Sequence, residues 1–516
     1  MVTPRRLFLL LAALIVLVAM LFRFSVLGLK AAHHDEGVNY AFTKKLVEKS
    51  VYHYNHTAYH GPFLYFVGAP AAAVAGYSKV ALRFTPALFG LLTVILALLL
   101  RRVIGDAGAL FGAALLAVSP ADVYFGRTFI HEVYFAFSLV LMLWAFLEAG
   151  RQGRALAIVA FWISWAIAFA TKETAAFHVI VMAPAVVVCW LVTAYGKPEE
   201  PFAVGPLFGR PVLYPFIWGM GITVSLWVLL FTSFLTNPQG MVDFFKAYIP
   251  WFETGVKKAT HVKVWYYFPE LIVTYYWPAV PFAAWAVVRG VWKRRPRTLA
   301  LSIVALGLLG LYSVIPYKTP WCLLTMGVAF VLLGADGFGD LWRALPRPWG
   351  RGLLAAVAVA ALLAYGAYSV RLNFLEFDFN HNQHENVRQY EIIYVQTVRG
   401  YEQMFDDLHR IAAQSGKGRK LPIHLSAGSK NPARLYLHKY RKVKVGRGGI
   451  DKPIKASVVF VRNKEKAKYA EHYDGEYQLF GTYPVFPGWN VNLMVRENLW
   501  QELQAAGIAP QANPSS

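Results

Sequence analysis

Long apolar runs alternate with short polar connections over the first 371 residues of the chain. A run of roughly twenty apolar residues is long enough to cross a bilayer as a helix. About eleven runs approach that length, at approximately residues 7–29, 80–100, 107–124, 131–149, 154–171, 174–195, 212–235, 267–289, 298–316, 319–337 and 352–371. The pattern therefore predicts that residues 1–371 form an all-α polytopic bundle in a membrane.

Three further segments lie between these runs. Residues 63–77 are apolar but short and contain Pro70, which is more typical of a re-entrant or interfacial helix than of a span. The connection 30–79 also contains an amphipathic stretch near helical spacing, and the connection 237–266 is rich in Trp, Tyr and Phe. We expect both long connections to form helices that lie along the membrane surface.

The pattern changes after residue 371, where apolar positions become sparse and β-branched residues cluster. The elements expected there are a helix over residues 385–411 and strands over 421–426, 457–461 and 491–495. We predict a small extracytoplasmic α/β domain over residues 372–504, which is within ordinary domain size. A disordered tail is expected over residues 505–516.

Composition and charge support a multi-pass membrane protein. Hydrophobic residues make up 57% of the chain and charged residues 16%, which excludes an ordinary soluble protein. The net charge of +22 fits basic cytoplasmic loops rather than nucleic-acid binding. With the N-terminus in the cytoplasm, every cytoplasmic connection carries a basic cluster: Arg5-Arg6, Arg101-Arg102, Arg151 with Arg154, Lys197 with Arg210, Arg289 to Arg297 and Arg343 to Arg351. The expected location is the inner (plasma) membrane, with the C-terminal domain outside the cytoplasm.

An acidic pair stands directly after the first predicted span, in His34-Asp35-Glu36. Carboxylates near the low-dielectric membrane surface can accept a proton from a substrate hydroxyl or bind a divalent cation. The alternative is that Asp35 caps the helix that follows. Both interpretations stay open from the residues alone.

Histidines follow at His53, His56 and His60, the last beside Gly61-Pro62. Their spacing matches no closed zinc motif. They are candidates to share a metal with Glu36, or they are interfacial side chains that water satisfies.

Further charged residues stand at the external ends of other spans. Arg127 and His131 are four residues apart, so a helix would place them on one face with Glu132 beside them. Arg127 suits a phosphate or carboxylate partner, and an Arg–Glu ion pair within the protein is the alternative. Lys172-Glu173 and Tyr317-Lys318 each offer a lysine that either binds a phosphate or extends to the membrane surface.

Several of these stretches resemble the GT-C glycosyltransferases, over about residues 1–340. The likeness is greatest to the protein O-mannosyltransferase and aminoarabinose transferase branch, family 39, and within it to a subgroup associated with flippase activity (Agl23-like). The matching stretches are His34-Asp35-Glu36, Tyr59 to Tyr65, Leu82 to Gly90 with Arg83, Ser119-Pro120 with Arg127 to Phe135, Thr171-Lys172-Glu173 and Tyr317 to Trp321.

The resemblance implies a membrane enzyme that transfers a sugar from a polyprenyl-phosphate donor to a protein or glycan hydroxyl on the extracytoplasmic face. It implies that Asp35 is the base and Glu36 a second catalytic carboxylate. The implied substrate contacts are His34, His60, Arg83, Arg127, His131, Glu132, Lys172, Glu173, Tyr317 and Lys318, and the implied ligands of a divalent cation are Glu36, His60 and Glu132. The competing hypothesis is a flippase-associated protein that binds or translocates lipid-linked glycans without catalysis.

Overall fold

The computed structural model describes residues 3–57, 60–196, 198, 202–208, 213–257, 261–378, 390–446 and 453–510. The chain divides into two compact units. The first, here called the helical unit, comprises Met1–Ser25, Lys45–Pro70 and Arg83–Asn373. The second, here called the mixed unit, comprises Val26–Lys44, Ala71–Leu82 and Phe374–Ser516.

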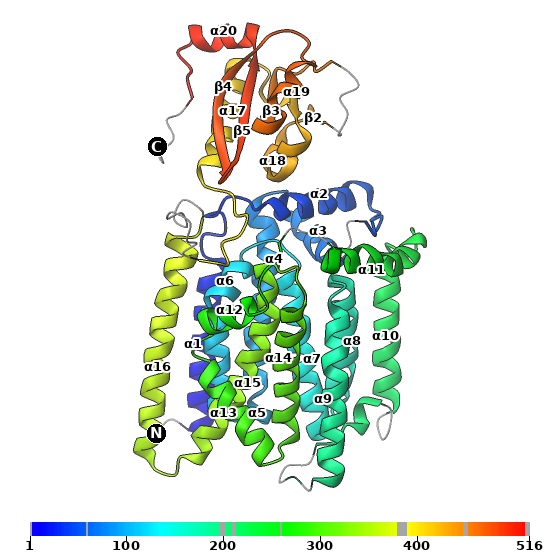
Figure 1. Cartoon of the computed structure of the whole chain (residues 1–516), viewed down its shortest axis with the longest axis vertical. Helices are drawn as coiled ribbons and strands as arrows, with labels where there is room; N and C mark the ends of the chain where they lie inside the picture. Colours follow the sequence, from blue (N-terminus) through cyan, green and yellow to red (C-terminus); the bar gives the residue numbers. More distant parts are fainter. Residues whose placement is uncertain are drawn as a thin grey trace. The chain divides into compact units, whose positions relative to one another are not determined.

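Long helices build the helical unit, and in Figure 1 most of them run side by side. Three of the helices, α2, α3 and α4, contribute residues to both units. The helices up to residue 370 are α1 (Pro4–Phe24), α2 (His34–Lys49), α3 (Phe63–Ala75), α4 (Lys79–Leu99), α5 (Arg101–Val118), α6 (Pro120–Gly126), α7 (Glu132–Gln152), α8 (Ala155–Thr171), α9 (Ala175–Tyr195), α10 (Leu213–Phe231), α11 (Gln239–Lys257), α12 (Tyr267–Tyr275), α13 (Val280–Trp292), α14 (Pro296–Val314), α15 (Leu323–Ala344) and α16 (Pro348–Val370).

Eight of the described helices are long and apolar enough to cross a membrane, or up to ten if each bent helix pair is one span. The bent pairs are α5 with α6, at 55°, and α12 with α13, at 110°. Helix α8 is apolar but has only 17 residues. A helix occupies each of the predicted apolar runs, so the all-α bundle is confirmed, whereas the number of eleven spans stays a prediction.

Small residues bring the central helices into close contact. A Cβ atom on Gly108 of α5 would lie 2.5 Å from the Ala335 carbonyl of α15. One on Gly337 of α15 would lie 2.0 Å from the Phe282 carbonyl of α13. Lipid offers no hydrophobic drive for helices to associate, so close backbone packing of this kind is what holds a membrane bundle together.

The segments predicted to lie along the membrane surface are helical. Helix α2 occupies the amphipathic stretch, and α3, with Pro70 inside it, has 13 residues. Helix α11 lies across the ends of α8 and α10 in Figure 1. It contacts both of them, because the Phe244 ring lies 6.4 Å from Phe169 and 4.8 Å from Trp227.

A five-stranded sheet organises the C-terminal part of the mixed unit, in the order β2-β1-β3-β5-β4. Strand β1 is parallel to β2 and β3, and β5 is antiparallel to β3 and β4. The strands and helices of this part are α17 (Gly400–Gln414), β1 (Ile423–Leu425), α18 (Lys430–Tyr436), β2 (Val443–Val445), β3 (Val458–Arg462), α19 (Lys466–Ala470), β4 (Tyr477–Phe486), β5 (Trp489–Arg496) and α20 (Glu497–Ala505). The three predicted strands are present as β1, β3 and β5.

One predicted element of this part is only partly correct. The helix expected over 385–411 begins only at Gly400, and residues 385–389 lie outside the described part of the chain. The backbone N–H of Val398 instead donates to the Val485 carbonyl at 2.9 Å. This contact with the end of β4 replaces the helical hydrogen bond that the local pattern suggested. The first residue of the predicted tail, Ala505, is the last residue of α20. Residues 511–516 lie outside the described part of the chain.

Candidate functional site

The turn at His60 is fixed against the end of α8. The backbone of His60 has a φ of 63°, and the N–H of Gly61 donates to the Thr171 carbonyl at 3.0 Å. A Cβ atom on Gly61 would lie 2.1 Å from the Ala170 carbonyl oxygen, so only glycine fits here. The sequence His60-Gly61-Pro62 therefore holds the histidine beside the residues that follow α8.

Glu173 binds both the backbone and the side chain of His60. Its Oε1 accepts the His60 N–H at 2.7 Å, and its Oε2 lies 3.1 Å from His60 Nδ1. Glu173 is buried, whereas the His60 side chain is one-third exposed. His60 is therefore the accessible member of a fixed carboxylate–histidine pair.

A buried ion pair joins the end of α8 to the start of α7. The Lys172 ammonium lies 2.7 Å from Glu132 Oε1, and both side chains are buried. Burial opposes the charge of Lys172, but the nearby Cys322 and Glu132 side chains together outweigh it and raise the pKa of Lys172 well above its usual range. The ammonium is also 3.9 Å from Cys322 Sγ at the start of α15.

His131 completes the cluster between these two pairs. Its ring lies 5.0 Å from the His60 ring and is buried. Burial, with added effects of His60 and Lys172, lowers the pKa of His131 well below its usual range. The imidazole is therefore neutral at pH 7. Its Nε2 atom is buried and has no hydrogen-bond partner among the described residues.

Two members of the cluster, His60 and Lys172, line a cavity of about 360 Å³. Its polar lining residues include His60, Lys172, Thr174, Thr254 and Thr319. The remaining wall is mostly apolar and comes from α9, α11, α12, α14 and the segment before α15: Phe177, Trp251, Phe252, Phe268, Tyr312, Val314, Ile315, Pro316, Tyr317 and Trp321. Such a cavity suits an amphiphile with a small charged group on a hydrocarbon chain.

Tyr317 and Lys318 have different surroundings. Tyr317 lines the cavity, and its ring lies 5.3 Å from His261. The Lys318 ammonium donates to the Ile315 carbonyl and, at 3.4 Å, to the Lys263 carbonyl. Lys318 is not among the described residues that line the cavity. Its side chain holds two polypeptide segments together, and burial lowers its pKa.

Arg127 does not share a helix with His131, which corrects one prediction. Helix α6 ends at Gly126, and residues 127–131 form a turn in which the Thr128 N–H donates to the Phe125 carbonyl at 3.0 Å. Arg127 is buried, and Nη1 donates to the Phe22 and Ser25 carbonyls at 2.9 and 2.6 Å.

These carbonyls belong to the end of α1, where helical partners are missing. Burial, together with the charge of the nearby Arg83, lowers the pKa of Arg127 to about 10. Arg83 is itself buried in α4. Neither arginine is among the described residues that line the cavity. Glu132 forms its ion pair with Lys172 rather than with Arg127, which was the alternative prediction.

The acidic pair belongs to the mixed unit, and its two carboxylates differ. Glu36 is buried, and its Oε2 accepts the His33 N–H at 2.8 Å, which caps the start of α2. The side chain of Asp35 is 41% exposed and lies 3.8 Å from His33 Nδ1. The ring of His34 lies 6.3 Å from Trp489, and burial lowers the His34 pKa. Asp35 is thus the more accessible carboxylate.

The predicted metal ligands are engaged with other partners. Glu36 caps α2, His60 binds Glu173, and Glu132 binds Lys172. No group of three or more His, Cys, Asp or Glu side chains that could hold a metal occurs in the described ranges of the chain. These donors do not fit a metal centre, and His53 and His56 bring no third ligand to it.

Sequence reasoning missed Thr174, Tyr312, Trp251 and Cys322 as parts of the cavity. Cys322 lies in an apolar run, and Trp251 lies in the aromatic connection after α10, so neither carries a local functional signal. Thr174, Tyr312 and Cys322 have one clue in the sequence, which is their proximity in the chain to Lys172 or Tyr317.

Comparisons with known proteins agree with the GT-C fold. Residues 59–202 match the family model described as dolichyl-phosphate-mannose-protein mannosyltransferase. ArnT from Cupriavidus metallidurans, bound to undecaprenyl phosphate, is similar in structure, with a TM-score of 0.67 and 15% identity. That similarity covers 96% of this chain and 99% of ArnT.

The Archaeoglobus fulgidus oligosaccharyltransferase, tethered to an acceptor peptide, has a TM-score of 0.55 and 13% identity. The similarity covers 97% of this chain and 77% of that chain. A comparison with curated proteins gives no significant match. At these identities the solved structures show the shared fold.

Proposed function

We propose that the chain is a membrane glycosyltransferase that transfers a sugar from a polyprenyl-phosphate donor to a protein or glycan hydroxyl. The observation that carries the proposal is the buried Lys172–Glu132 ion pair, whose lysine lines a mostly apolar cavity. A phosphate with an isoprenoid chain matches both parts of that cavity. The fold shared with ArnT, whose structure holds undecaprenyl phosphate, supports the same class of donor.

The cluster provides the groups that a departing lipid phosphate needs. The Lys172 ammonium lies in a site of low dielectric, where it stabilises negative charge that develops on the phosphate. Glu132 holds the ammonium in place before the donor arrives. Neutral His131 packs against the His60 ring and adds no charge to the site. The His60–Glu173 pair offers a second fixed hydrogen-bonding group.

We assign the general base to Asp35. Its carboxylate accepts the proton of the acceptor hydroxyl, and the oxygen attacks the anomeric carbon as the bond from that carbon to the phosphate oxygen breaks. The products are the glycosylated acceptor and the free lipid phosphate. The exposure of Asp35 supports this assignment over Glu36, which the capping contact at α2 occupies.

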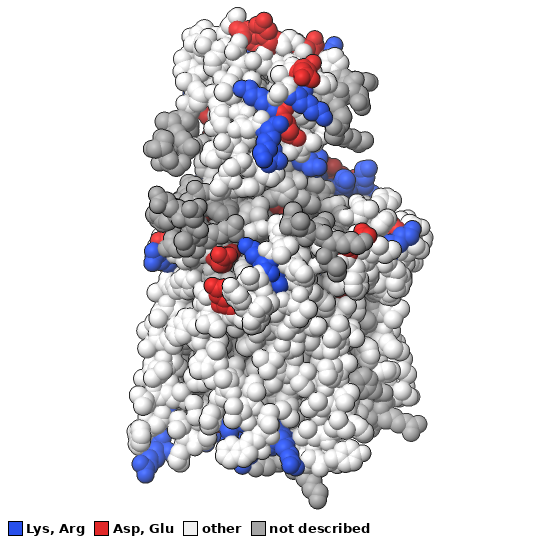
Figure 2. Space-filling model, viewed as in Figure 1, with Lys and Arg blue, Asp and Glu red and all other residues white. Residues whose placement is uncertain are grey.

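We place the reaction on the extracytoplasmic face and the N-terminus in the cytoplasm. Figure 2 shows Lys and Arg, without Asp or Glu, on the visible surface at the end of the helical unit where α1 begins. Basic residues collect on the cytoplasmic side of membrane proteins. The inner (plasma) membrane remains the expected location. The finer family assignment that we propose is the Agl23-like subgroup.

A flippase-associated, non-catalytic protein is the second candidate. Its support is the two bent helix pairs, α5 with α6 and α12 with α13, because broken spans are typical of transporters. However, the charged groups of the cluster lie at helix ends: Lys172 follows α8 and Glu132 begins α7. Catalysis at the membrane face accounts better for that placement.

The test measures transfer from a labelled polyprenyl-phosphate sugar in membranes that contain the protein. We expect Lys172→Met and Asp35→Asn each to lower transfer at least 100-fold when transfer is measured per amount of folded protein. Lys246→Met is the matched control, because Lys246 is an exposed lysine of α11. Half or more of wild-type transfer by Lys172→Met would overturn the phosphate site. Movement of the labelled lipid across vesicles without any transfer would support the second candidate.

A further inference from the structure

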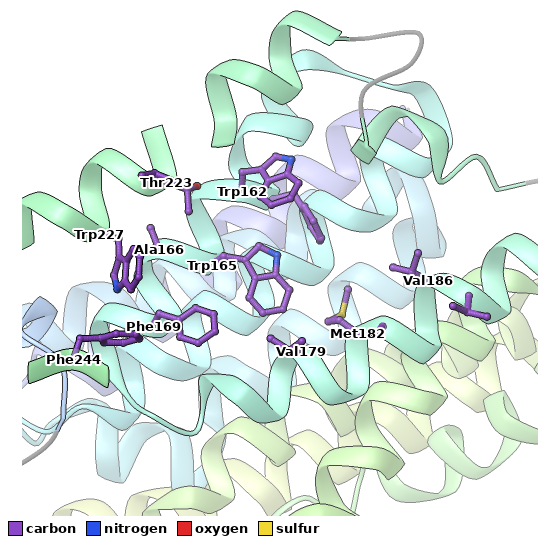
Figure 3. Close-up of a pocket in the computed structure, with 14 residues that line it drawn as sticks. Trp162, Trp165, Ala166, Phe169, Val179, Met182, Val186, Thr223, Trp227 and Phe244 are labelled. Carbon is purple, nitrogen blue, oxygen red and sulfur yellow. The ribbon is translucent and has the colours of Figure 1, made fainter. Parts of the chain in front are cut away.

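Aromatic side chains gather in both units, but with different neighbours. In the helical unit, a cavity of about 710 Å³ lies between α8, α9, α10 and α11, and rings such as those of Trp162, Trp165 and Phe169 line it (Figure 3). None of its described lining residues is charged. In the mixed unit, Phe486 and Trp489 lie at the turn between β4 and β5, and an arginine stacks on the tryptophan. The group in the mixed unit therefore offers a charge to a ligand.

Trp489 is the centre of this group. The guanidinium carbon of Arg462 lies 3.6 Å from the centre of the Trp489 ring. Arg462 ends β3 and pairs with Val491 of β5, so Arg462 and Trp489 lie on one face of the sheet as diagonal neighbours. The rings of Phe486 and His34 lie 4.9 and 6.3 Å from the Trp489 ring. Arg462 and Trp489 are both half-buried, so each keeps surface that a ligand can reach.

The guanidinium of Arg462 has no acidic partner in the described part of the chain. Its Nε atom is buried without an acceptor there, and the Nη groups end a half-buried side chain. Glu465, three residues later, instead accepts the Ser426 hydroxyl and the Gly428 N–H, the latter at 3.1 Å. A planar guanidinium with free N–H groups binds a carboxylate through two parallel hydrogen bonds. Stacking on Trp489 holds the group in one orientation before a ligand arrives.

Lys430 brings a second positive charge to this group. It begins α18 and is half-buried. Burial lowers the pKa of His34, and the charge of Lys430 lowers it further, so the ammonium is close to the His34 ring. Asp35 follows His34 in α2 and acts on the same ring with the opposite sign. Two cations and two aromatic rings therefore surround the proposed base.

A sugar that carries a carboxylate matches these side chains. The apolar C–H face of a pyranose packs on an aromatic ring, and the carboxylate pairs with the guanidinium. A phosphate monoester carries about −1.5 to −2 charges at pH 7. The Asp35 carboxylate repels that charge more strongly than the single charge of a sugar acid. The group therefore favours a sugar acid over a sugar phosphate.

We infer that Trp489, Arg462 and Lys430 form a binding site for the acceptor, here called the sugar-acid subsite, and that the acceptor is a glycan with a carboxylate-bearing sugar beside its reactive hydroxyl. Arg462 and Lys430 bind the carboxylate, and Trp489 holds the pyranose. The reactive hydroxyl then lies at Asp35. This inference rests on the proposed function, and the bonds that form and break are the same.

Binding is measured with the full-length protein in nanodiscs and two fluorescent trisaccharides that differ at one sugar, which is glucuronic acid in one and glucose in the other. We expect the glucuronic acid form to bind at least about tenfold more tightly. Arg462→Gln should reduce this ratio to less than about twofold, because it removes the charge that pairs with the carboxylate. Trp489→Leu should weaken the binding of both glycans. Arg441→Gln is the matched control, because Arg441 is an exposed arginine of the same unit outside the subsite.

The ratio between the two glycans separates recognition from folding. Damage to the turn between β4 and β5 would weaken both glycans by the same factor, and that result for Arg462→Gln would overturn the subsite. Equal or undetectable binding of the two glycans by the wild type would also overturn it. Tighter binding of a third trisaccharide, with glucose 6-phosphate at the variable position, would overturn the assignment to a sugar acid.

Transfer connects the subsite to the reaction. With a labelled polyprenyl-phosphate sugar as donor, we expect Arg462→Gln to raise the KM for the glucuronic acid glycan at least about tenfold and to leave kcat within about twofold, because Arg462 binds the acceptor and takes no part in the bond changes. Equal transfer to both glycans by the wild type would overturn the inference and leave the glycosyltransferase standing. Selective binding of the glucuronic acid glycan without any transfer would refute the proposed function alone.

Discussion

The Lys172–Glu132 pair gives the sharpest test of how the cluster is held together. Two charges in a buried site stabilise the fold only as a pair, since removal of one leaves the other without compensation. The two side chains are buried and their charged atoms are 2.7 Å apart. Loss of either partner is expected to cost about 3–5 kcal/mol of stability.

We therefore expect Lys172→Met and Glu132→Leu each to destabilise the protein by about 3–5 kcal/mol, and the double variant to cost far less than their sum. Replacing a whole buried ion pair by apolar residues is often neutral or stabilising. The coupling between the two sites is then several kcal/mol, well above the roughly 0.3–0.5 kcal/mol found for independent sites.

The assay is unfolding of the purified protein in detergent, followed by fluorescence for the wild type, both single variants and the double variant. Additive losses in the double variant would refute a mutually compensating pair and would mean that each side chain has other main partners. The proposed function adds a contrast: the double variant recovers stability but not sugar transfer, because it lacks the ammonium that binds the phosphate.

Two further predictions concern the neighbours of this pair. Gly61→Ala places a methyl group 2.1 Å from the Ala170 carbonyl, and we expect a loss of about 1–3 kcal/mol in the free energy of unfolding together with lower transfer. Gly221→Ala is the control, because no atom lies near the Cβ position of Gly221. Equal stability and transfer of the two variants would contradict the tight turn at Gly61. His131, whose pKa burial lowers, stays neutral in the fold but takes up a proton when unfolded below pH of about 6.5. The contribution of neutral His131 to the free energy of unfolding is therefore fully present above a pH of about 6.5. It decreases as the pH falls below that value. Urea titrations at several pH values should show a weaker dependence in His131→Gln, and an unchanged dependence would exclude His131 as its source.

Much of the helical unit was predictable because membrane spans follow from the length of apolar runs. Each predicted run is helical, from α1 to α16. The number of spans was harder to predict, because Ser119-Pro120 and the segment after Tyr275 divide two runs into bent pairs. The bend depends on how each half packs against its neighbours.

Roles of single charged residues were less predictable. Lys172 and Glu132 were both candidates, but their partnership depends on the approach of α7 to α8, which no local spacing encodes. Arg127 has the local features of an anion-binding residue, yet its guanidinium satisfies the free carbonyls at the end of α1. Only the packing of α6 against α1 decides that outcome.

The sequence by itself determined which segments are helical and apolar, and which polar residues stand at their ends, because these properties depend on local composition and on hydrophobic length. The tertiary structure decided which of those residues meet: it joined His60 to Glu173 and Lys172 to Glu132, and it assigned Glu36 to a helix cap. It also formed the cavity at Lys172, whose walls come from segments far apart in the chain. Side-chain partners are fixed by long-range packing, and that information resides in the whole sequence rather than in any one motif.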